Sequence, residues 1–362
     1  MVNFTSSIIE KASKSALLIK DNIPYIAFDA YYEDMTNSNI GWWTNSFYSG
    51  ILWYLYKETN NEEFASWAKN IERKLDVVLD GVKDVDHDAG FMWILTSVCS
   101  YKLTNDLKSK KRALRAADLL FGRFNKKGQY IQAWNGDWAK GWAIIDTMMN
   151  LSLLYWASKE TIDNKYKEVA IKCADTVLKH FIDENGSVRH IVMFDEKGNK
   201  KGVKGGQGYN ETSSWGRGTA WALYGLTITY RETKEERFLN AANKVASFIK
   251  KHLPSEGVPY ADYLAPKEEK RKLDSSAGAI SACGFYLLYQ LTNDNEYLNM
   301  GNKIIEGLKK TCLAPSDYQP LLLHGNVAYH TDKIEERDCS LIYGDFFFIE
   351  ALMLLNKKDT FF

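Results

Sequence analysis

Residues 62–76, EEFASWAKNIERKLD, and residues 143–158, AIIDTMMNLSLLYWAS, are the two stretches that decide the fold. The first places apolar residues at i, i+3, i+4 and i+7, with lysine and glutamate on the opposite side. This pattern predicts a helix with one face in water. The second stretch is apolar nearly all round, and such a helix must be surrounded by protein. The pair therefore predicts an outer and an inner helix.

Each kind of helix recurs along the chain. The outer pattern returns at 109–124, 165–181, 235–253 and 295–313, and an opening outer helix is predicted near residues 7 to 20. The inner pattern returns at 44–59, 91–104, 216–233, 276–292 and 340–355. Six outer and six inner helices then alternate along the sequence, which predicts one all-α domain over residues 1–362, an (α/α)6 barrel.

The connections between these helices are of two kinds. The inner-to-outer turns are short and polar, as in KETNNEE, KLTNDLK and LTNDNEY, whereas the connections that lead into inner helices are long and irregular. Long loops on a rigid scaffold commonly carry the functional site. The amino-terminal ends of the inner helices would converge at this mouth, where their partial positive charge favours a carboxylate or another anion.

Composition excludes several classes of partner. Lysine plus arginine equals aspartate plus glutamate at 46 each, so there is no bulk field to hold nucleic acid or an anionic membrane. The five cysteines are scattered without a CxxC pair, which argues against a disulfide framework or a zinc knuckle. The first twenty residues lack the features of a secretory signal, and no stretch approaches about 20 apolar residues. We expect a cytoplasmic protein, a monomer or weak homodimer, with a small-molecule substrate and no cofactor.

Tryptophan is concentrated in the long loops and at the starts of the inner helices. Indole rings stack on the flat C–H faces of sugars, and they also plug wide barrel mouths, so both interpretations stay open. The residues concerned are Trp42, Trp43, Trp134, Trp138, Trp142, Trp215 and Trp221, with Trp93 nearby.

Three acidic residues are candidates for chemistry: Asp86, Asp88 and Asp146. Asp146 lies in the first turn of an otherwise apolar inner helix, where a carboxylate is unfavourable unless it is paired or used. Asp88 comes just before another inner helix and is either an N-cap or a site residue. The run DVDHD around Asp86 and His87 also suggests a metal, but no second ligand cluster appears in the sequence, so we predict none.

The longest loop leads to Arg217 at the start of an inner helix. Its guanidinium could bind a substrate carboxylate in bidentate fashion, or it could bridge to a neighbouring acidic residue. The glycine-rich segment GGQGYN in the same loop follows no strand, which argues against a phosphate site.

Eight motifs in this order resemble those of the unsaturated glucuronyl hydrolases, glycoside hydrolases that finish the breakdown of lyase-cut glycosaminoglycans. The motifs span nearly the whole chain: WWTNSF (42–47), DHDAGF (86–91), IIDTMMN (144–150), QGYNETSSWGRGTAWALYG (207–225), VPYADY (258–263), DSSAGAISACG (274–284), LLLHG (321–325) and YGDFFFIEAL (343–352). The resemblance implies the same (α/α)6 barrel. It also implies a substrate with a 4,5-unsaturated uronic acid at its non-reducing end, whose vinyl ether is hydrated.

The resemblance also implies roles for individual residues. Asp146 would be the general acid and base that protonates C4 and helps water to add at C5, and Asp88 would be its partner carboxylate. The sugar site would be lined by Trp43, Asn45, His87, Trp134, His190, Gln207, Arg217, Trp221, Tyr343 and Lys333. Some members of the family favour sulfated substrates through an arginine at the position of Gly206 and a serine at that of Ala328. This chain departs from that pattern, which favours unsulfated or differently sulfated disaccharides.

Three other functions stay open. An unsaturated rhamnogalacturonyl hydrolase would share the barrel and the hydration chemistry and act on pectin fragments, but the DHD and QGY motifs argue against it. A sugar epimerase would work through histidine bases. A carbohydrate-binding barrel without catalysis would not need intact Asp88 and Asp146. His87 either tunes Asp88 or holds its loop.

Overall fold

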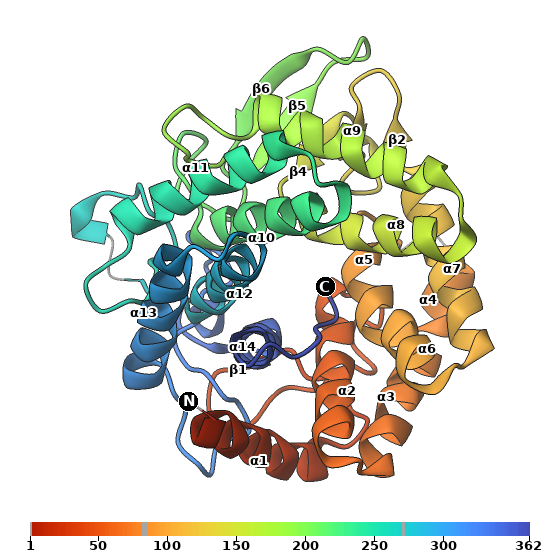
Figure 1. The fold of residues 1–362 in the computed structure, drawn as a ribbon, viewed down its shortest axis with the longest axis vertical. Helices are drawn as coiled ribbons and strands as arrows, with labels where there is room; N and C mark the ends of the chain where they lie inside the picture. Colours follow the sequence, from red (N-terminus) through yellow and green to blue (C-terminus); the bar gives the residue numbers. More distant parts are fainter. Residues whose placement is uncertain (1, 82–84, 270–271) are drawn as a thin grey trace.

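The protein is a closed double ring of helices, viewed along its axis in Figure 1. The computed structural model describes residues 2–81, 85–269 and 272–362. The outer helices are α1 (Val2–Ile19), α3 (Glu62–Lys74), α7 (Leu107–Gly122), α9 (Asn164–His180), α11 (Glu236–His252) and α13 (Asn295–Thr311). The inner helices are α2 (Phe47–Thr59), α5 to α6 (within 89–104), α8 (Thr147–Thr161), α10 (Gly216–Thr233), α12 (Ser275–Thr292) and α14 (Ile342–Leu355). The predicted (α/α)6 barrel is confirmed.

The second inner helix is less regular than the periodicity predicts. It runs as α5 (Ala89–Trp93), a π-helical turn η2 (Ile94–Val98) and α6 (Cys99–Thr104). A short helix, α4 (Asp76–Gly81), and four 3-10 turns complete the helical elements of the described residues. These turns are η1 (Trp43–Ser46), η3 (Asp137–Ala139), η4 (Lys267–Glu269) and η5 (Ile334–Glu336).

The short inner-to-outer turns share one local structure. Asn60, Asn105 and Asn293 end their inner helices in the left-handed conformation, with φ between 55° and 58°. The next residue begins the outer helix: the side chains of Asn61, Asp106 and Asp294 each accept a hydrogen bond from the backbone N–H two positions on. Asparagine tolerates a positive φ, and an Asx side chain caps a helix start. The repeated polar turns therefore make neighbouring helices antiparallel.

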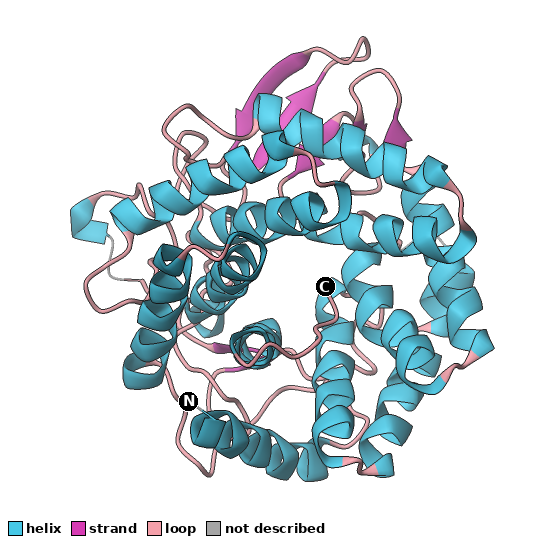
Figure 2. Cartoon of the chain, viewed as in Figure 1, coloured by secondary structure: helices cyan, strands magenta, loops and turns pink. Residues whose placement is uncertain are grey.

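The long loops form short antiparallel strand pairs, some within one loop and some between two loops, coloured magenta in Figure 2. Strand β1 (Ile26–Ala27) pairs with β7 (Ser340–Leu341), and β2 (Phe124–Asn125) pairs with β3 (Tyr130–Ile131). Strand β5 (Ile191–Phe194) lies between β4 (Trp142–Ile144) and β6 (Lys200–Lys204). Strand β6 directly precedes the GGQGYN segment, so the expectation that no strand precedes this segment is wrong. Strand pairing supplies hydrogen bonds to backbone N–H and C=O groups of the loops that would otherwise be buried without a partner. The register Ile144↔Ile191 places Asp146 beside His190.

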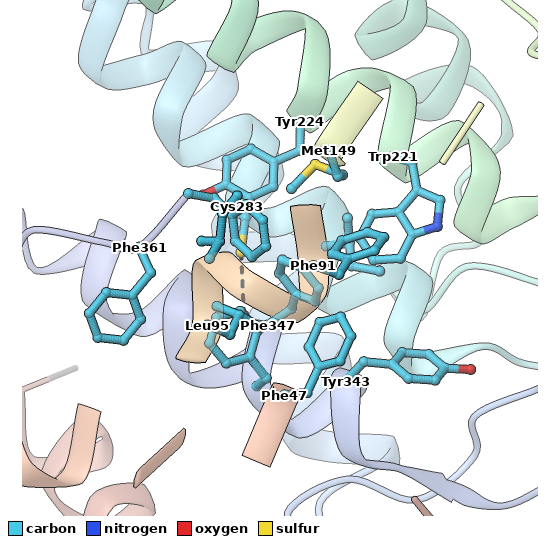
Figure 3. Packing of buried hydrophobic residues seen from close by; sticks show 14 of the residues in the cluster. Phe47, Phe91, Leu95, Met149, Trp221, Tyr224, Cys283, Tyr343, Phe347 and Phe361 are labelled. Carbon is cyan, nitrogen blue, oxygen red and sulfur yellow. Dashed lines mark hydrogen bonds between the residues drawn. The ribbon is translucent and has the colours of Figure 1, made fainter. Parts of the chain in front are cut away.

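Aromatic side chains fill the middle of the ring, so it is a packed core and not a pore. Phe47, Phe91, Trp221 and Phe347 come from α2, α5, α10 and α14 and meet with ring centroids 5.1 to 5.8 Å apart (Figure 3). Phe361 stacks on Tyr54 at 4.2 Å, so the last described residues pack into the same core.

All five cysteines are free, buried thiols. Within the described ranges, every helix is too short or too polar to cross a membrane. The cytoplasmic location and the monomeric or weakly dimeric state remain predictions.

Candidate active site

A cavity of about 1060 Å³ lies at the amino-terminal ends of the inner helices. Its wall includes residues at the starts of α2, α5, α8 and α14 and residues of the long loops. Nine of the predicted site residues line it: Trp43, His87, Asp88, Trp134, Asp146, His190, Gln207, Lys333 and Tyr343. The convergence of inner helices at one mouth, expected from the loop lengths, is therefore present.

Asp146 is the residue immediately before α8, but it does not cap that helix through its side chain. The carboxyl is buried and lines the cavity. Its Oδ2 atom finds no hydrogen-bond partner among the residues that the structure describes. Burial, reinforced by the negative charge of Asp88, raises the pKa of Asp146 to about 7, against the opposing charges of His87 and Arg217. A buried acid that keeps its proton near neutral pH is suited to general acid catalysis.

Asp88 immediately precedes α5, and its side chain likewise makes no capping hydrogen bond. Its Oδ1 atom accepts a hydrogen bond from Asn150 Nδ2 at 3.1 Å and lies 3.3 Å from His87 Nε2. Burial, and then the charge of Asp86, raises the pKa of Asp88 well above its usual range. The geometry therefore favours the site interpretation of Asp88 over the N-cap.

Asn150 connects the two acids, although it is not among the site residues predicted from the sequence. It lies one helical turn after Asp146, and its Nδ2 donates to the Asp146 carbonyl at 3.1 Å as well as to Asp88. Its Oδ1 accepts the backbone N–H of Phe91 at 2.7 Å. A Cβ at Gly90 would lie 2.4 Å from the Asn150 Cα, so α5 and α8 can approach this closely only because residue 90 is glycine. An asparagine four positions after Asp146 in an apolar helix was the available signal.

His87 both touches Asp88 and holds its loop. Its Nδ1 lies 2.9 Å from the Ala133 carbonyl, and its ring meets Trp134 edge-on with centroids 5.6 Å apart. Together with Asp86 and Asp88 it offers ligand atoms within 4.8 Å of one another. The Ala133 carbonyl occupies one His87 nitrogen, and Asp86 Oδ1 accepts the Asp88 N–H at 2.9 Å. Asp84 of the same run lies outside the described residues. The absence of a metal stays a prediction.

His190 faces Asp146 across a short gap, with Nε2 3.7 Å from Asp146 Oδ2. Its ring is buried and packs on Trp215 at 4.3 Å. Burial, together with the charges of Arg217 and His87, lowers the pKa of His190 to about 3, although the Gly205 carbonyl opposes this shift. His190 is therefore neutral at physiological pH.

Comparison with known proteins identifies the family of the chain. The model of Glycosyl Hydrolase Family 88 matches residues 19–281. The chain belongs to this family. It is 33% identical to the unsaturated chondroitin disaccharide hydrolase of Streptococcus pyogenes serotype M1 over 344 residues, which cover 91% of this chain and 84% of the relative. It superposes on the crystal structure of the unsaturated glucuronyl hydrolase of Bacillus sp. GL1 with a TM-score of 0.92 and 27% identity, covering 99% and 97% of the two chains. An unsaturated glucuronyl hydrolase specific for heparin gives a TM-score of 0.88 at 29% identity, covering 98% and 96%. The resemblance seen in the motifs is confirmed, and the protein is a glycoside hydrolase.

Three residues that the family resemblance places in the sugar site do not line the cavity. Asn45 is buried and donates to the carbonyls of Asn39 and Ile40, both at 2.8 Å, so it holds a loop of the cavity wall. Trp221 is buried in the aromatic core (Figure 3). Arg217 binds Asp274, which is the alternative that the sequence left open. Their roles in this glycoside hydrolase remain predictions.

Arg217 is fully buried behind the cavity wall. Its Nη1 donates to the Asn326 carbonyl at 2.7 Å and to Asp274 at 3.2 Å, and Nη2 donates to the Val327 carbonyl at 2.8 Å. The guanidinium stacks between the rings of Trp215 and Tyr343, 4.3 and 5.0 Å from their centroids. Its Nε atom finds no hydrogen-bond partner among the described residues, but the whole side chain is buried and does not line the cavity.

The predicted tryptophan set divides into three groups. Trp42, Trp43 and Trp134 line the cavity, whereas Trp93, Trp215 and Trp221 are buried. Trp138 is exposed and stacks on Trp134 at 5.6 Å, and Trp142 meets it edge-on. Both the ligand interpretation and the packing interpretation are thus supported, each for different residues.

Lys333 lines the cavity, but an acid of its own segment pairs with it. Glu336 Oε1 accepts from Lys333 Nζ at 2.8 Å, and Glu336 Oε2 accepts from Thr331 Oγ1 at 2.6 Å. Asp29, Glu33 and Glu335 also line this wall. The wall is therefore acidic, and it contains no unpaired lysine or arginine among the described residues of the cavity.

Proposed function

We propose that the protein releases the 4,5-unsaturated uronic acid from the non-reducing end of unsaturated glycosaminoglycan disaccharides by hydrating the C4=C5 vinyl ether. One observation carries this proposal: a buried carboxyl, Asp146, whose pKa is raised to about 7 and whose Oδ2 is unpartnered on the cavity wall. The names of the relatives support the substrate class.

The reaction uses Asp146 first as an acid and then as a base. Protonated Asp146 gives its proton to C4, and positive charge develops at C5 beside the ring oxygen. Water adds at C5 and returns one proton to the Asp146 carboxylate. The hemiketal that results opens, and the glycosidic bond breaks with loss of the neighbouring sugar. General acid–base catalysis of this kind contributes about 10² to 10⁴ in rate, and positioning of the water adds to it.

Asp88 is the partner carboxylate in this proposal. In its ionised form, Asp88 helps to keep the proton on Asp146 before the reaction. Asn150, which donates to Asp88 and to the Asp146 carbonyl, fixes the separation of the two acids.

The acidic wall around Glu336 favours unsulfated aglycone sugars. Because Glu336 accepts hydrogen bonds from both Lys333 and Thr331, a sulfate at this wall would have to displace a carboxylate. This supports the preference suggested by Gly206 and Ala328, which depart from the sulfate-binding pattern.

The test follows the ultraviolet absorbance of the conjugated uronate double bond during incubation with single unsaturated disaccharides. Separate reactions would contain disaccharides from hyaluronan, chondroitin, heparin and pectin. We expect loss of absorbance with a glycosaminoglycan disaccharide. Loss with the pectin fragment alone would instead indicate the rhamnogalacturonyl hydrolase, and no loss with any of the four would favour the epimerase or the binding barrel.

A further inference from the structure

One nitrogen of His190 has two backbone neighbours with opposite requirements. Nδ1 lies 2.9 Å from the Gly205 carbonyl oxygen, which can only accept a hydrogen bond. The same Nδ1 lies 3.0 Å from the Gln207 backbone nitrogen, whose N–H can only donate. A neutral imidazole nitrogen either carries a proton or accepts one. His190 Nδ1 can therefore satisfy Gly205 or Gln207, but not both at once.

The arrangement depends on the glycine between these two neighbours. Gly206 has φ +56°, and a Cβ there would lie 2.3 Å from His190 Nδ1. The segment can curl around the nitrogen because residue 206 lacks a side chain. On its other side the imidazole packs on Trp215, which holds the ring in this orientation.

The second nitrogen of the ring faces the proposed acid. His190 Nε2 and Asp146 Oδ2 are 3.7 Å apart, and both lack a hydrogen-bond partner among the described side chains and backbone groups. A small side-chain rotation would join them. The other charged or titratable groups facing this pair are His87 and Asp88 beside α5 and Arg217 of α10. Because burial keeps His190 neutral, the ring can respond to Asp146 by moving a proton between its nitrogens without gaining a charge.

We propose that His190 is a positioning residue that changes tautomer with the protonation state of Asp146, using the Gly205 carbonyl and the Gln207 N–H as alternative partners. When Asp146 is protonated, its O–H donates to Nε2, and Nδ1–H donates to Gly205. When Asp146 is ionised, Nε2–H donates to the carboxylate, and Nδ1 accepts from Gln207. The ring loses one proton to water and gains one from water, so its charge is unchanged. Both forms of Asp146 are then hydrogen-bonded, as a group acting first as acid and then as base requires. The value of this exchange for turnover rests on the proposed function.

The direct test is ¹⁵N NMR of the full chain labelled at histidine, recorded from pH 5 to pH 9. The His190→Gln variant would assign the His190 signals. Nitrogens with and without a proton resonate far apart, so the two tautomers are distinguishable. We expect Nδ1 to carry the proton at pH 5 and Nε2 to carry it at pH 9. In Asp146→Asn, which cannot titrate, the tautomer should stay the same throughout. A wild-type His190 with one tautomer over this range, or with a charged ring at pH 5, would overturn the proposal.

Gly206→Ala tests whether the backbone of residues 205–207 takes part in the tautomer exchange of His190. The added methyl would push the 205–207 backbone away from the ring, so we expect the pH-dependent exchange to disappear while the melting temperature shows whether the variant folds. An exchange unchanged in folded Gly206→Ala would also overturn the proposal. If that variant does not fold, the wild-type and Asp146→Asn spectra still decide the matter. These spectra can be recorded without turnover. A protein that shows no loss of uronate absorbance would therefore overturn the proposed function, whereas the tautomer proposal would still be decided by the spectra.

Discussion

Two buried acids at opposite ends of the inner helices have the same raised pKa and different surroundings. Burial raises the pKa of Asp146 and of Glu350 to about 7 in each case. Glu350, near the carboxyl-terminal end of α14, accepts hydrogen bonds from Tyr54 at 2.9 Å and Tyr224 at 2.6 Å. Asp146 leaves Oδ2 unpartnered on a cavity wall. A perturbed pKa therefore does not identify a catalytic acid, because structural acids are perturbed too. The unpartnered atom and the cavity distinguish the two.

The two rims of the ring, where the short turns and the long loops lie, also differ in regularity. At the rim with the short turns, one local structure recurs: a residue in the left-handed conformation is followed by the start of an outer helix. The five left-handed residues are Asn60, Asn105, Ile162, Lys234 and Asn293. At the other rim each loop differs from the next, and the cavity residues come from these loops. The regular rim closes the fold, and the irregular rim carries the chemistry.

Asp146→Asn should have the largest effect of any change at these two acids. The amide keeps the shape of the side chain but has no proton to give, so we expect kcat to fall by about 10² to 10⁴. The measurement is the rate of loss of uronate absorbance, with the melting temperature recorded in parallel. Glu350→Gln is the matched control, since it also replaces a buried acid with a pKa of about 7. Similar losses of activity in both variants would mean that the unpartnered atom and the cavity do not distinguish a catalytic acid from a structural one.

The pH dependence of turnover should follow Asp146. Because the acid must be protonated and its pKa is about 7, kcat/KM should fall above pH 7, by about tenfold for each further pH unit. Initial rates between pH 5 and pH 9 with one disaccharide would show this limb. A rate that stays constant up to pH 9 would mean that another group supplies the proton.

The sequence predicted the ring and the two acids for reasons that are local. The wet-faced helices and the all-apolar helices differ in periodicity, and a carboxylate in an apolar helix is conspicuous wherever the chain folds. The contacts that complete the site are not local. Asn150 reaches Asp88 across 62 positions, and Arg217 finds Asn326 and Val327 more than 100 positions away. The charge of Arg217 did not reveal these partners. They are backbone carbonyl oxygens, which every residue has, so no residue type in the sequence indicates them.

Glu350→Gln should lower stability without affecting chemistry. Since a Gln amide cannot accept from both tyrosines as the acid does, we expect a loss of about 1 to 3 kcal/mol in the free energy of unfolding. The folded pKa of Glu350 lies above its ordinary value, so its contribution is complete below about pH 4 and is lost as pH rises through about 7. Denaturant unfolding at pH 5 and pH 8 should therefore show a larger difference between wild type and variant at pH 5. Activity should change less than about twofold, and a larger loss would place Glu350 in the catalytic machinery.

Ile162→Asn should have the smallest effect and should be stabilising. Ile162 has φ +56° and is 94% exposed, at the turn position where three other repeats have asparagine. A left-handed conformation costs a β-branched residue about 1 to 2 kcal/mol, and asparagine tolerates it better, so we expect a gain of about 0.5 to 1 kcal/mol. The reciprocal change, Asn293→Ile, should destabilise by a similar amount, and both should leave kcat and KM unchanged. Thermal unfolding of the two variants measures this directly. If Ile162→Asn were destabilising, the exposed Ile162 side chain would contribute to stability in a way that its contacts do not show. The rim with the short turns would then have a role beyond closing the fold.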